Sequence, residues 1–265
     1  MKYKALITDF DGTLVGLGFT PSPQVKEAVR RLLESDIKVC IATGRTYHGI
    51  IESVCQQLNL TDLQIASAGA QIIDPKTNKI IWEEYLPEKE ARSIVEFLIN
   101  DSHPFALEIE EYVYTDDEDI KIRYGAGILF KEIKKADLSK VSKVFVPDIS
   151  LEHSLRELFP NLNVIVAGLR IRHALDITSK KASKELAVLE LAKILNIDPE
   201  EMIGLGDGYN DIPLLSVCGF KVAMENAPEE LKEIADVIVP IVEQDGFLTL
   251  TNLLLQPNGD LLSKE

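Results

Sequence analysis

Four aspartates follow two apolar runs of the chain, two after each run. They are Asp9, Asp11, Asp207 and Asp211. The first pair comes after the run at 5–8, and the second pair lies in the stretch GDGYND at 206–211. Each pair alone has an ordinary interpretation as a turn, because Asp-Gly is a common turn dipeptide. Together they indicate four carboxylates that meet at one edge of a sheet, and these would repel one another unless a cation lies between them.

The chemistry of these residues favours a hard metal ion and a phosphate. Carboxylate oxygens without histidine or cysteine select a hard ion, and a site completed by water and phosphate favours Mg²⁺. Thr43 and Gly44 follow another apolar run, where they offer a hydroxyl and an unobstructed backbone N–H at the start of an expected helix. The same pair is also a plausible plain helix start. Asn210, within GDGYND, is an equally plausible helix N-cap.

Lys184 is the candidate positive charge. On a helical wheel it shares a face with apolar residues, which are Ala187, Val188, Leu191 and Leu195. A lysine at the end of an apolar stripe is commonly one whose stem extends past the core. The acidic clusters elsewhere favour a role in holding an anion.

The elements that must position these residues alternate along the chain. Strands are expected at 5–8, 38–42, 64–67, 202–206, 221–224 and 237–239, and helices at about 23–33, 46–58, 183–195 and 211–217. Ser22 and Pro23 form an N-cap and N1 pair for the first helix. This alternation predicts an α/β fold with a doubly wound parallel sheet. In such sheets ligands bind beyond the carboxyl ends of the strands, where the four aspartates fall.

The pattern changes after about residue 75. Between 80 and 172 the sequence predicts one helix at 88–100, strand-like pieces at 105–109 and 143–146, and a solvated acidic loop, TDDED, at 115–119. This segment is expected to be an inserted α+β domain.

Composition excludes several classes of function. With 43 acidic and 28 basic residues the formal charge is -15, so neither nucleic acid nor an anionic membrane is an expected partner. Three cysteines at unrelated spacings indicate neither a disulfide framework nor a zinc site. No stretch has the length of a membrane span and no signal peptide is evident, so a cytoplasmic protein is expected.

The motifs, in their order along the chain, resemble those of the haloacid dehalogenase superfamily. The four motifs are DFDGT at 9–13, Thr43 in ATGR, Lys184, and GDGYND at 206–211. The large insert between the second and third motifs is similar to that of the Cof-type sugar-phosphatase subgroup, as are VAMENA at 222–227 and QDGF at 244–247.

The resemblance implies a Rossmann-like doubly wound parallel core under an inserted α+β cap that determines substrate specificity. The core is expected at 1–80 and 175–265, and the cap at 81–174. A phosphatase of this kind acts on small phosphorylated metabolites, with sugar phosphates as the expected class, and is a monomer or a homodimer.

The resemblance also assigns roles to the candidate residues. Asp9 would be the nucleophile that forms an aspartyl phosphate, and Asp11 the acid and then the base. Mg²⁺ would be held by Asp9, the backbone carbonyl of Asp11, Asp207 and Asp211, with Asp211 as a direct or an outer ligand. The phosphate would be held by Thr43, Gly44, Lys184 and Asn210.

Two alternatives remain beside hydrolysis. A sugar phosphomutase would return the phosphoryl group to a sugar, and a phospho-accepting signalling module would use Asp9 only as a switch. The chain also departs from the subgroup. It has Ala68 where asparagine is frequent, and Glu185 and Glu225 where glycine is frequent, so the resemblance does not identify the leaving group.

Overall fold

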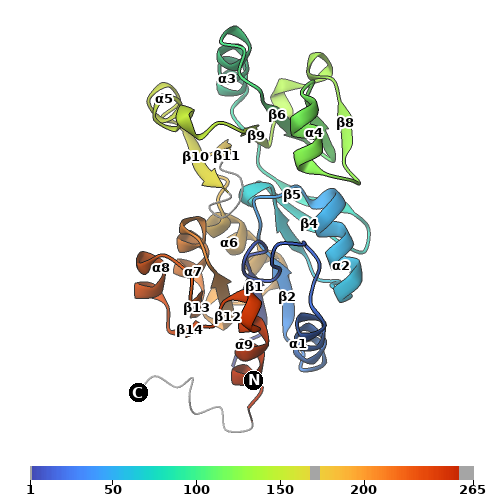
Figure 1. Cartoon of the computed structure of the whole chain (residues 1–265), viewed down its shortest axis with the longest axis vertical. Coiled ribbons are helices and arrows are strands. Elements are labelled where there is room, and N and C mark those ends of the chain that lie inside the picture. Colours follow the sequence, from blue (N-terminus) through green and yellow to red (C-terminus); the bar gives the residue numbers. More distant parts are fainter. Residues whose placement is uncertain (1, 168–173, 257–265) are drawn as a thin grey trace. The chain divides into compact units, whose positions relative to one another are not determined.

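The computed structural model describes residues 2–167 and 174–256 of the 265-residue chain (Figure 1). It divides into two compact units, and each is described by itself. Unit 1 comprises the described residues within Met1–Ile41, Val54–Asp62 and Ala192–Glu265. Unit 2 comprises those within Ala42–Ser53 and Leu63–Leu191.

A parallel sheet of five strands forms the centre of unit 1, in the order β14-β13-β12-β1-β2. The strands are β1 (Ala5–Thr8), β2 (Lys38–Ile41), β12 (Met202–Gly206), β13 (Phe220–Met224) and β14 (Val237–Val239). In β1, Thr8 lies opposite Leu205 on one side and Ile41 on the other. All four side chains of β1 are buried, as in a parallel sheet covered on both faces. The predicted parallel α/β core is therefore confirmed.

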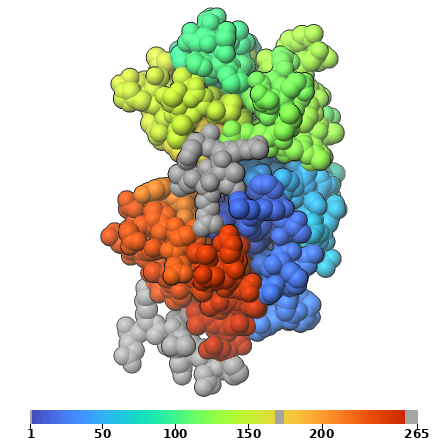
Figure 2. Space-filling model, viewed as in Figure 1, coloured from blue at the N-terminus to red at the C-terminus, as the bar shows by residue number. Residues whose placement is uncertain are grey.

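Helices of unit 1 flank this sheet. They are α1 (Pro23–Glu34), α7 (Ile212–Val217), α8 (Glu229–Ile234) and α9 (Gly246–Leu254). α1 packs against α9, and Figure 2 shows their blue and red surfaces side by side. The side chain of Ser22 caps α1 by accepting the backbone N–H of Val25 at 3.1 Å, and Pro23 takes the first helical position, as the sequence predicts. Helices α2 (Glu52–Leu58) and α6 (Lys184–Leu195) contribute residues to both units.

Unit 2 contains two sheets. The smaller one is antiparallel, with β3 (Gln64–Ala66), β4 (Gln71–Asp74) and β5 (Lys79–Glu83) in that order. The larger one has six strands in the order β10-β11-β9-β6-β7-β8. Its strands are β6 (Ala106–Ile109), β7 (Tyr112–Tyr114), β8 (Leu129–Lys131), β9 (Lys143–Val146), β10 (Leu162–Ala167) and β11 (Ala174–Ser179). Only β7 and β8 pair in parallel among these described strands.

The two faces of the six-stranded sheet differ in composition. One face carries Leu107, Val144 and Ile177 in a large apolar core that also includes buried residues of α3 (Glu88–Asn100) and α5 (Glu152–Leu158). The other face carries a smaller apolar group with Ala106 and Phe145, against which α4 (Glu118–Tyr124) packs. Because side chains alternate along a strand, residues two positions away from this apolar group lie on the same face of the sheet, and these include Glu108, Lys143 and Asp176.

Several local predictions are wrong, each for a physical reason. The regular helix expected from residue 46 begins only at Glu52, because His48 is extended and Gly49 has a φ of +84°. The run at 64–67 forms the expected strand, β3, but this strand pairs antiparallel with β4 in the three-stranded sheet instead of joining the parallel sheet, while a parallel bridge joins Ile65 to Ala42. The acidic stretch at 115–119 is not only a loop: the side chain of Asp117 caps α4 and accepts the N–H of Ile120 at 2.8 Å.

Two further properties bear on function. Cys40, Cys55 and Cys218 are free thiols, and all three are buried. Within residues 2–167 and 174–256, no helix has both the length and the apolar character that a membrane span requires.

Candidate active site

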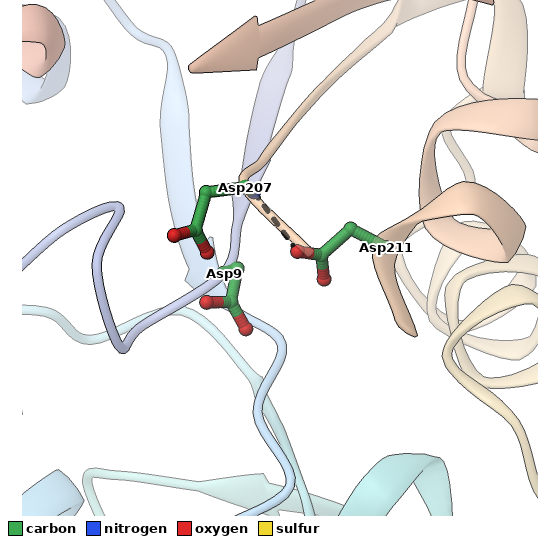
Figure 3. Close-up of side chains that lie close together, drawn as sticks. All are labelled: Asp9, Asp207 and Asp211. Carbon is green, nitrogen blue, oxygen red and sulfur yellow. Dashed lines mark hydrogen bonds between the residues drawn. The ribbon is translucent and has the colours of Figure 1, made fainter. Parts of the chain in front are cut away.

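The carboxylates of Asp9, Asp207 and Asp211 meet at the carboxyl end of the parallel sheet in unit 1. Asp9 follows β1 and donates its backbone N–H to the carbonyl of Leu205 in β12 at 2.8 Å. Asp207 follows β12 directly, so the two aspartates leave adjacent strands at the same level. One oxygen from each of the three carboxylates lies within 4.8 Å of the others, and Figure 3 shows the three side chains close together.

The turn after β12 is built around Asp211. Its Oδ2 accepts the backbone N–H groups of Asp207 at 3.0 Å and of Gly208 at 2.9 Å, and Figure 3 draws the first of these bonds. A β-carbon on Gly206 would lie 2.4 Å from Cβ of Asp211, so only glycine fits there. Asp211 is fully buried and Asp9 nearly so. Buried carboxylates this close together favour a bound cation.

Neighbouring side chains fix the carboxylate of Asp207. Thr13 donates its hydroxyl to Oδ1 at 3.3 Å, and Asn226 donates Nδ2 to Oδ2 at 2.9 Å. Gly12 has a φ of +85°, and a β-carbon there would lie 2.5 Å from Oδ2 of Asp207. Neither Asn226 nor Thr13 has an assigned role from the sequence alone, although both lie in stretches that carry the resemblance.

Asp11 and Asn210 belong to unit 1 but lie outside the three-carboxylate cluster. Asp11 is exposed and forms a β-bridge with Val15 in the turn after β1. The side-chain oxygen of Asn210 lies close over Gly208, 2.4 Å from where a β-carbon would be.

Thr43 and Gly44 begin a turn in unit 2. Thr43 is buried, donates its N–H to the carbonyl of Ile65 at 3.1 Å, and accepts the N–H of Ala68 at its own carbonyl at 3.0 Å. Its Oγ1 accepts the N–H of Arg45 at 3.1 Å. The turn after β2 is thus bound to the turn after β3.

Lys184 begins α6 and is buried in unit 2. A β-carbon on Gly69, whose φ is +89°, would lie 2.8 Å from the backbone nitrogen of Lys184. Since Ala68 also bonds Thr43, the turn at 67–69 contacts both predicted phosphate-binding segments of unit 2. Ala68 itself has a φ of +57° and is buried, so this departure from the subgroup occupies a strained position.

A family model decides the identity of the chain. Residues 6–250 match the model described as haloacid dehalogenase-like hydrolase. The chain belongs to this family. The resemblance noted in the sequence is therefore confirmed. We interpret the site as that of a haloacid dehalogenase-like hydrolase.

Named relatives of this haloacid dehalogenase-like hydrolase include phosphatases. Phosphatase YwpJ of Bacillus subtilis is 26% identical over 286 residues, covering 95% of this chain and 100% of its own. A haloacid dehalogenase-like hydrolase from Bacteroides thetaiotaomicron superimposes with a TM-score of 0.83 at 23% identity, covering 96% of this chain and 100% of that chain. The subclass IIB sugar phosphatase BT4131 gives a TM-score of 0.81 at 24% identity, covering 94% and 98%.

Haloacid dehalogenase-like hydrolases generally use a divalent metal, and the residues of this chain fit one. The cluster offers only oxygen ligands, which suit a hard divalent cation. Asn226 adds an independent observation: its Oδ1 is buried without a hydrogen-bond partner among the described residues, while its Nδ2 holds Asp207. A buried amide oxygen of this kind needs a donor, and water bound to a metal would supply one.

Proposed function

We propose that this protein is a Mg²⁺-dependent phosphatase that hydrolyses small phosphorylated metabolites, with sugar phosphates as the expected class, through an aspartyl-phosphate intermediate. The observation that carries the proposal is the cluster of Asp9, Asp207 and Asp211 at the carboxyl end of the parallel sheet, in which Asp9 and Asp211 are buried. The names of YwpJ, a phosphatase, and of BT4131, a sugar phosphatase, support the reaction and the substrate class.

In the first step, an oxygen of Asp9 attacks the phosphorus atom. The new bond from Asp9 to phosphorus forms as the bond from phosphorus to the leaving oxygen breaks, and Asp11 gives that oxygen a proton. Division of the hydrolysis into two transfers suits a weak nucleophile such as a carboxylate. Asp11 is assigned the acid role because it lies outside the three-carboxylate cluster, so its carboxyl group is not one of the three grouped as metal ligands.

In the second step, water attacks the phosphorus atom of the aspartyl phosphate. Asp11, now ionised, accepts a proton from this water, the bond from Asp9 to phosphorus breaks, and inorganic phosphate leaves. Asp9 and Asp11 then return to their starting protonation states. One pair of carboxyl groups therefore serves both steps.

The remaining residues would hold charge in place. Mg²⁺ would be bound by Asp9, the carbonyl of Asp11, Asp207 and Asp211, and when bound it neutralises charge on the transferring group. Thr43, Gly44, Lys184 and Asn210 would hold the phosphate oxygens. Asn226 and Thr13 orient Asp207 for its part in this set.

We further propose that the segment 81–174 is a cap that excludes water from the bound substrate, and that 1–80 and 175–265 form the core. A charge of -15 argues against nucleic acid as a partner. We propose a cytoplasmic enzyme that is a monomer or a homodimer, in keeping with metabolite substrates.

The deciding experiment is phosphate release from a panel of sugar phosphates, nucleotides and short-chain phosphates, with Mg²⁺ and with EDTA. Asp9→Asn should abolish release while leaving the circular dichroism spectrum unchanged. Asp36→Asn is the matched control, since it removes an exposed carboxylate of the same unit at a left-handed position that asparagine tolerates. Turnover that survives in Asp9→Asn would sink the proposal, and phosphorylated sugar products without free phosphate would identify a mutase.

A further inference from the structure

Three buried charged residues lie side by side on one face of the six-stranded sheet. Glu108 on β6, Lys143 on β9 and Asp176 on β11 are each less than 5% exposed. Glu108 is directly opposite Lys143 in the ladder, and Asp176 pairs with Phe145, two residues further along β9. The strands therefore bring one ammonium group between two carboxylates.

Lys143 makes an ion pair with both carboxylates. Its Nζ lies 2.9 Å from Oε1 of Glu108 and 3.3 Å from Oδ1 of Asp176. Desolvation of three charges is unfavourable, and buried ion pairs often stabilise a fold no better than apolar residues of the same volume. Stability alone therefore does not explain why these three charged residues are buried. Their other contacts, with the turns that follow β2 and β3, provide an explanation.

The third partner of Lys143 is the turn that follows β2. Its Nζ donates to the backbone carbonyl of Gly44 at 2.5 Å. A β-carbon on Gly44 would lie 2.9 Å from Oδ2 of Asp176, so the backbone of this turn comes close to the charged residues and leaves little space for a side chain.

This bond fixes the peptide between Gly44 and Arg45 at both ends. Its carbonyl oxygen accepts from Lys143, and its N–H donates to Oγ1 of Thr43 at 3.1 Å. Because the peptide group is planar, rotation of one end moves the other. The Thr43 hydroxyl accepts here, and since a hydroxyl has one hydrogen, it keeps that hydrogen for donation to another group.

The same cluster reaches the neighbouring turn through Glu108. Its Oε2 accepts the hydroxyl of Ser67 at 2.6 Å. Ser67 in turn donates its backbone N–H to the carbonyl of Arg45 at 2.8 Å, and its φ is +52°, a conformation that L-residues seldom adopt. One charged cluster thus holds both turns that surround Thr43.

We propose that Lys143, held between Glu108 and Asp176, is a positioning residue for phosphate binding. It sets the orientation of the Gly44–Arg45 peptide, and through this peptide it directs the Thr43 hydroxyl toward a phosphate oxygen. The inference rests on the proposed function, because it takes Thr43 as a phosphate-binding residue. It also gives the segment predicted as the cap a direct part in shaping the turn after β2.

The test compares three variants with the wild-type protein. Lys143→Met removes the ammonium group. Lys143→Met with Glu108→Gln removes one charge of each sign, so the cluster keeps its net charge and the variant has a better prospect of folding. Lys140→Met is the matched control, because Lys140 makes an exposed ion pair with Glu110 at 2.7 Å in the same unit, away from the turn.

Two readouts separate positioning from a purely structural role. The inhibition constant of inorganic phosphate is measured together with KM and kcat. It should rise by about tenfold in the double variant, because the hydrogen bond from the Thr43 hydroxyl to the charged phosphate is lost. Hydrogen exchange at the Arg45 amide should become faster. Lys140→Met should change neither quantity.

The outcomes are distinct from those of the proposed function. Failure of the wild-type protein to release or bind phosphate would count against the function, whereas the Arg45 exchange rate tests the clamp without reference to activity. A double variant that is unfolded, or one that is folded with wild-type phosphate inhibition and Arg45 exchange, would show that the cluster serves folding alone and would overturn the inference.

Discussion

The carboxylate of Asp211 accepts the backbone N–H of Asp207 at 3.0 Å, so one acidic residue of the cluster fixes the backbone of another. The same oxygen accepts the N–H of Gly208. A single side chain therefore closes the turn after β12 and contributes negative charge to the cluster. The two tasks can be separated, because asparagine keeps an oxygen acceptor but lacks the charge.

Replacement Asp211→Asn should weaken Mg²⁺ binding by roughly 10–100-fold while the fold is retained, since ligand and outer-shell changes have effects of this size. Isothermal titration calorimetry measures the affinity. Asp236→Asn is the control, because Asp236 also accepts a backbone N–H, that of Lys221 at 2.9 Å, but lies outside the cluster. Equal affinities in the two variants would exclude Asp211 from the metal site.

Gly12→Ala should abolish or strongly reduce activity. The added β-carbon would lie 2.5 Å from Oδ2 of Asp207, and the φ of +85° disfavours alanine in any case. Gly18→Ala provides the comparison, because a β-carbon there has no atom within 4 Å. Kinetics and thermal unfolding of both variants test this, and a fully active Gly12→Ala would show that the carboxylate of Asp207 can move without consequence.

Addition of Mg²⁺ should raise Tm, because a ligand that binds only the native state stabilises it, by about 2.7 kcal/mol at a concentration of 100 times Kd. The increase should be smaller in Asn226→Ala, which removes the donor to Oδ2 of Asp207 and the buried amide oxygen. Differential scanning fluorimetry over a Mg²⁺ series measures both effects. An Asn226→Ala protein with the full wild-type increase would contradict a role for this residue near the metal.

The pH dependence of stability should change in Asp176→Asn. Burial raises the pKa of Asp176, Glu108 adds to the rise, and Lys143 and Arg123 oppose it. A raised native pKa means that this group's contribution is fully present below the unfolded pKa, about 3.9, and is lost as pH rises through the native value. The variant should therefore lose less stability than the wild-type protein over that interval.

Asp148→Asn serves as a control of opposite sign for this measurement. The hydroxyl and N–H of Ser150 lower the pKa of Asp148, so its contribution is present above the unfolded pKa and is lost as pH falls through the native value. Urea unfolding between about pH 2 and about pH 8 follows both, because the interval of Asp148 lies below its ordinary pKa and that of Asp176 above it. Identical curves for Asp176→Asn and the wild-type protein would mean that Asp176 keeps an ordinary pKa in the native state.

Elements with a distinct apolar pattern were the ones that the sequence could predict. The helix at 88–100 and the strands at 143–146, 202–206 and 237–239 have the predicted bounds. Helices α4 and α5 were missed, because seven residues are too few for a helical period to stand out from neighbouring loops. The kink at Gly49 was also missed, since its positive φ comes with a close approach to the carbonyl of Ala126, which lies far away in the sequence.

The candidate site shows the same division. The convergence of Asp9 and Asp207 could be predicted because both follow strands of one parallel sheet, while their chemical roles stay predictions. Asn226 could not be assigned, because an asparagine after a strand has many ordinary explanations until its contact with Asp207 is seen. Lys143 was equally hidden, since a lysine at the start of a strand is normally exposed to water.

The three cysteines of the chain have a practical consequence for measurements on its parts. Cys40, Cys55 and Cys218 are each at most 3% exposed, and burial raises the pKa of the Cys40 thiol and raises that of Cys218 to about 12. Thiolates are the reactive form, so maleimide reagents should leave the folded wild-type protein unlabelled. A single cysteine introduced on an exposed surface would then be the only labelled site, and fluorescent probes could be attached to either unit without removal of the native residues.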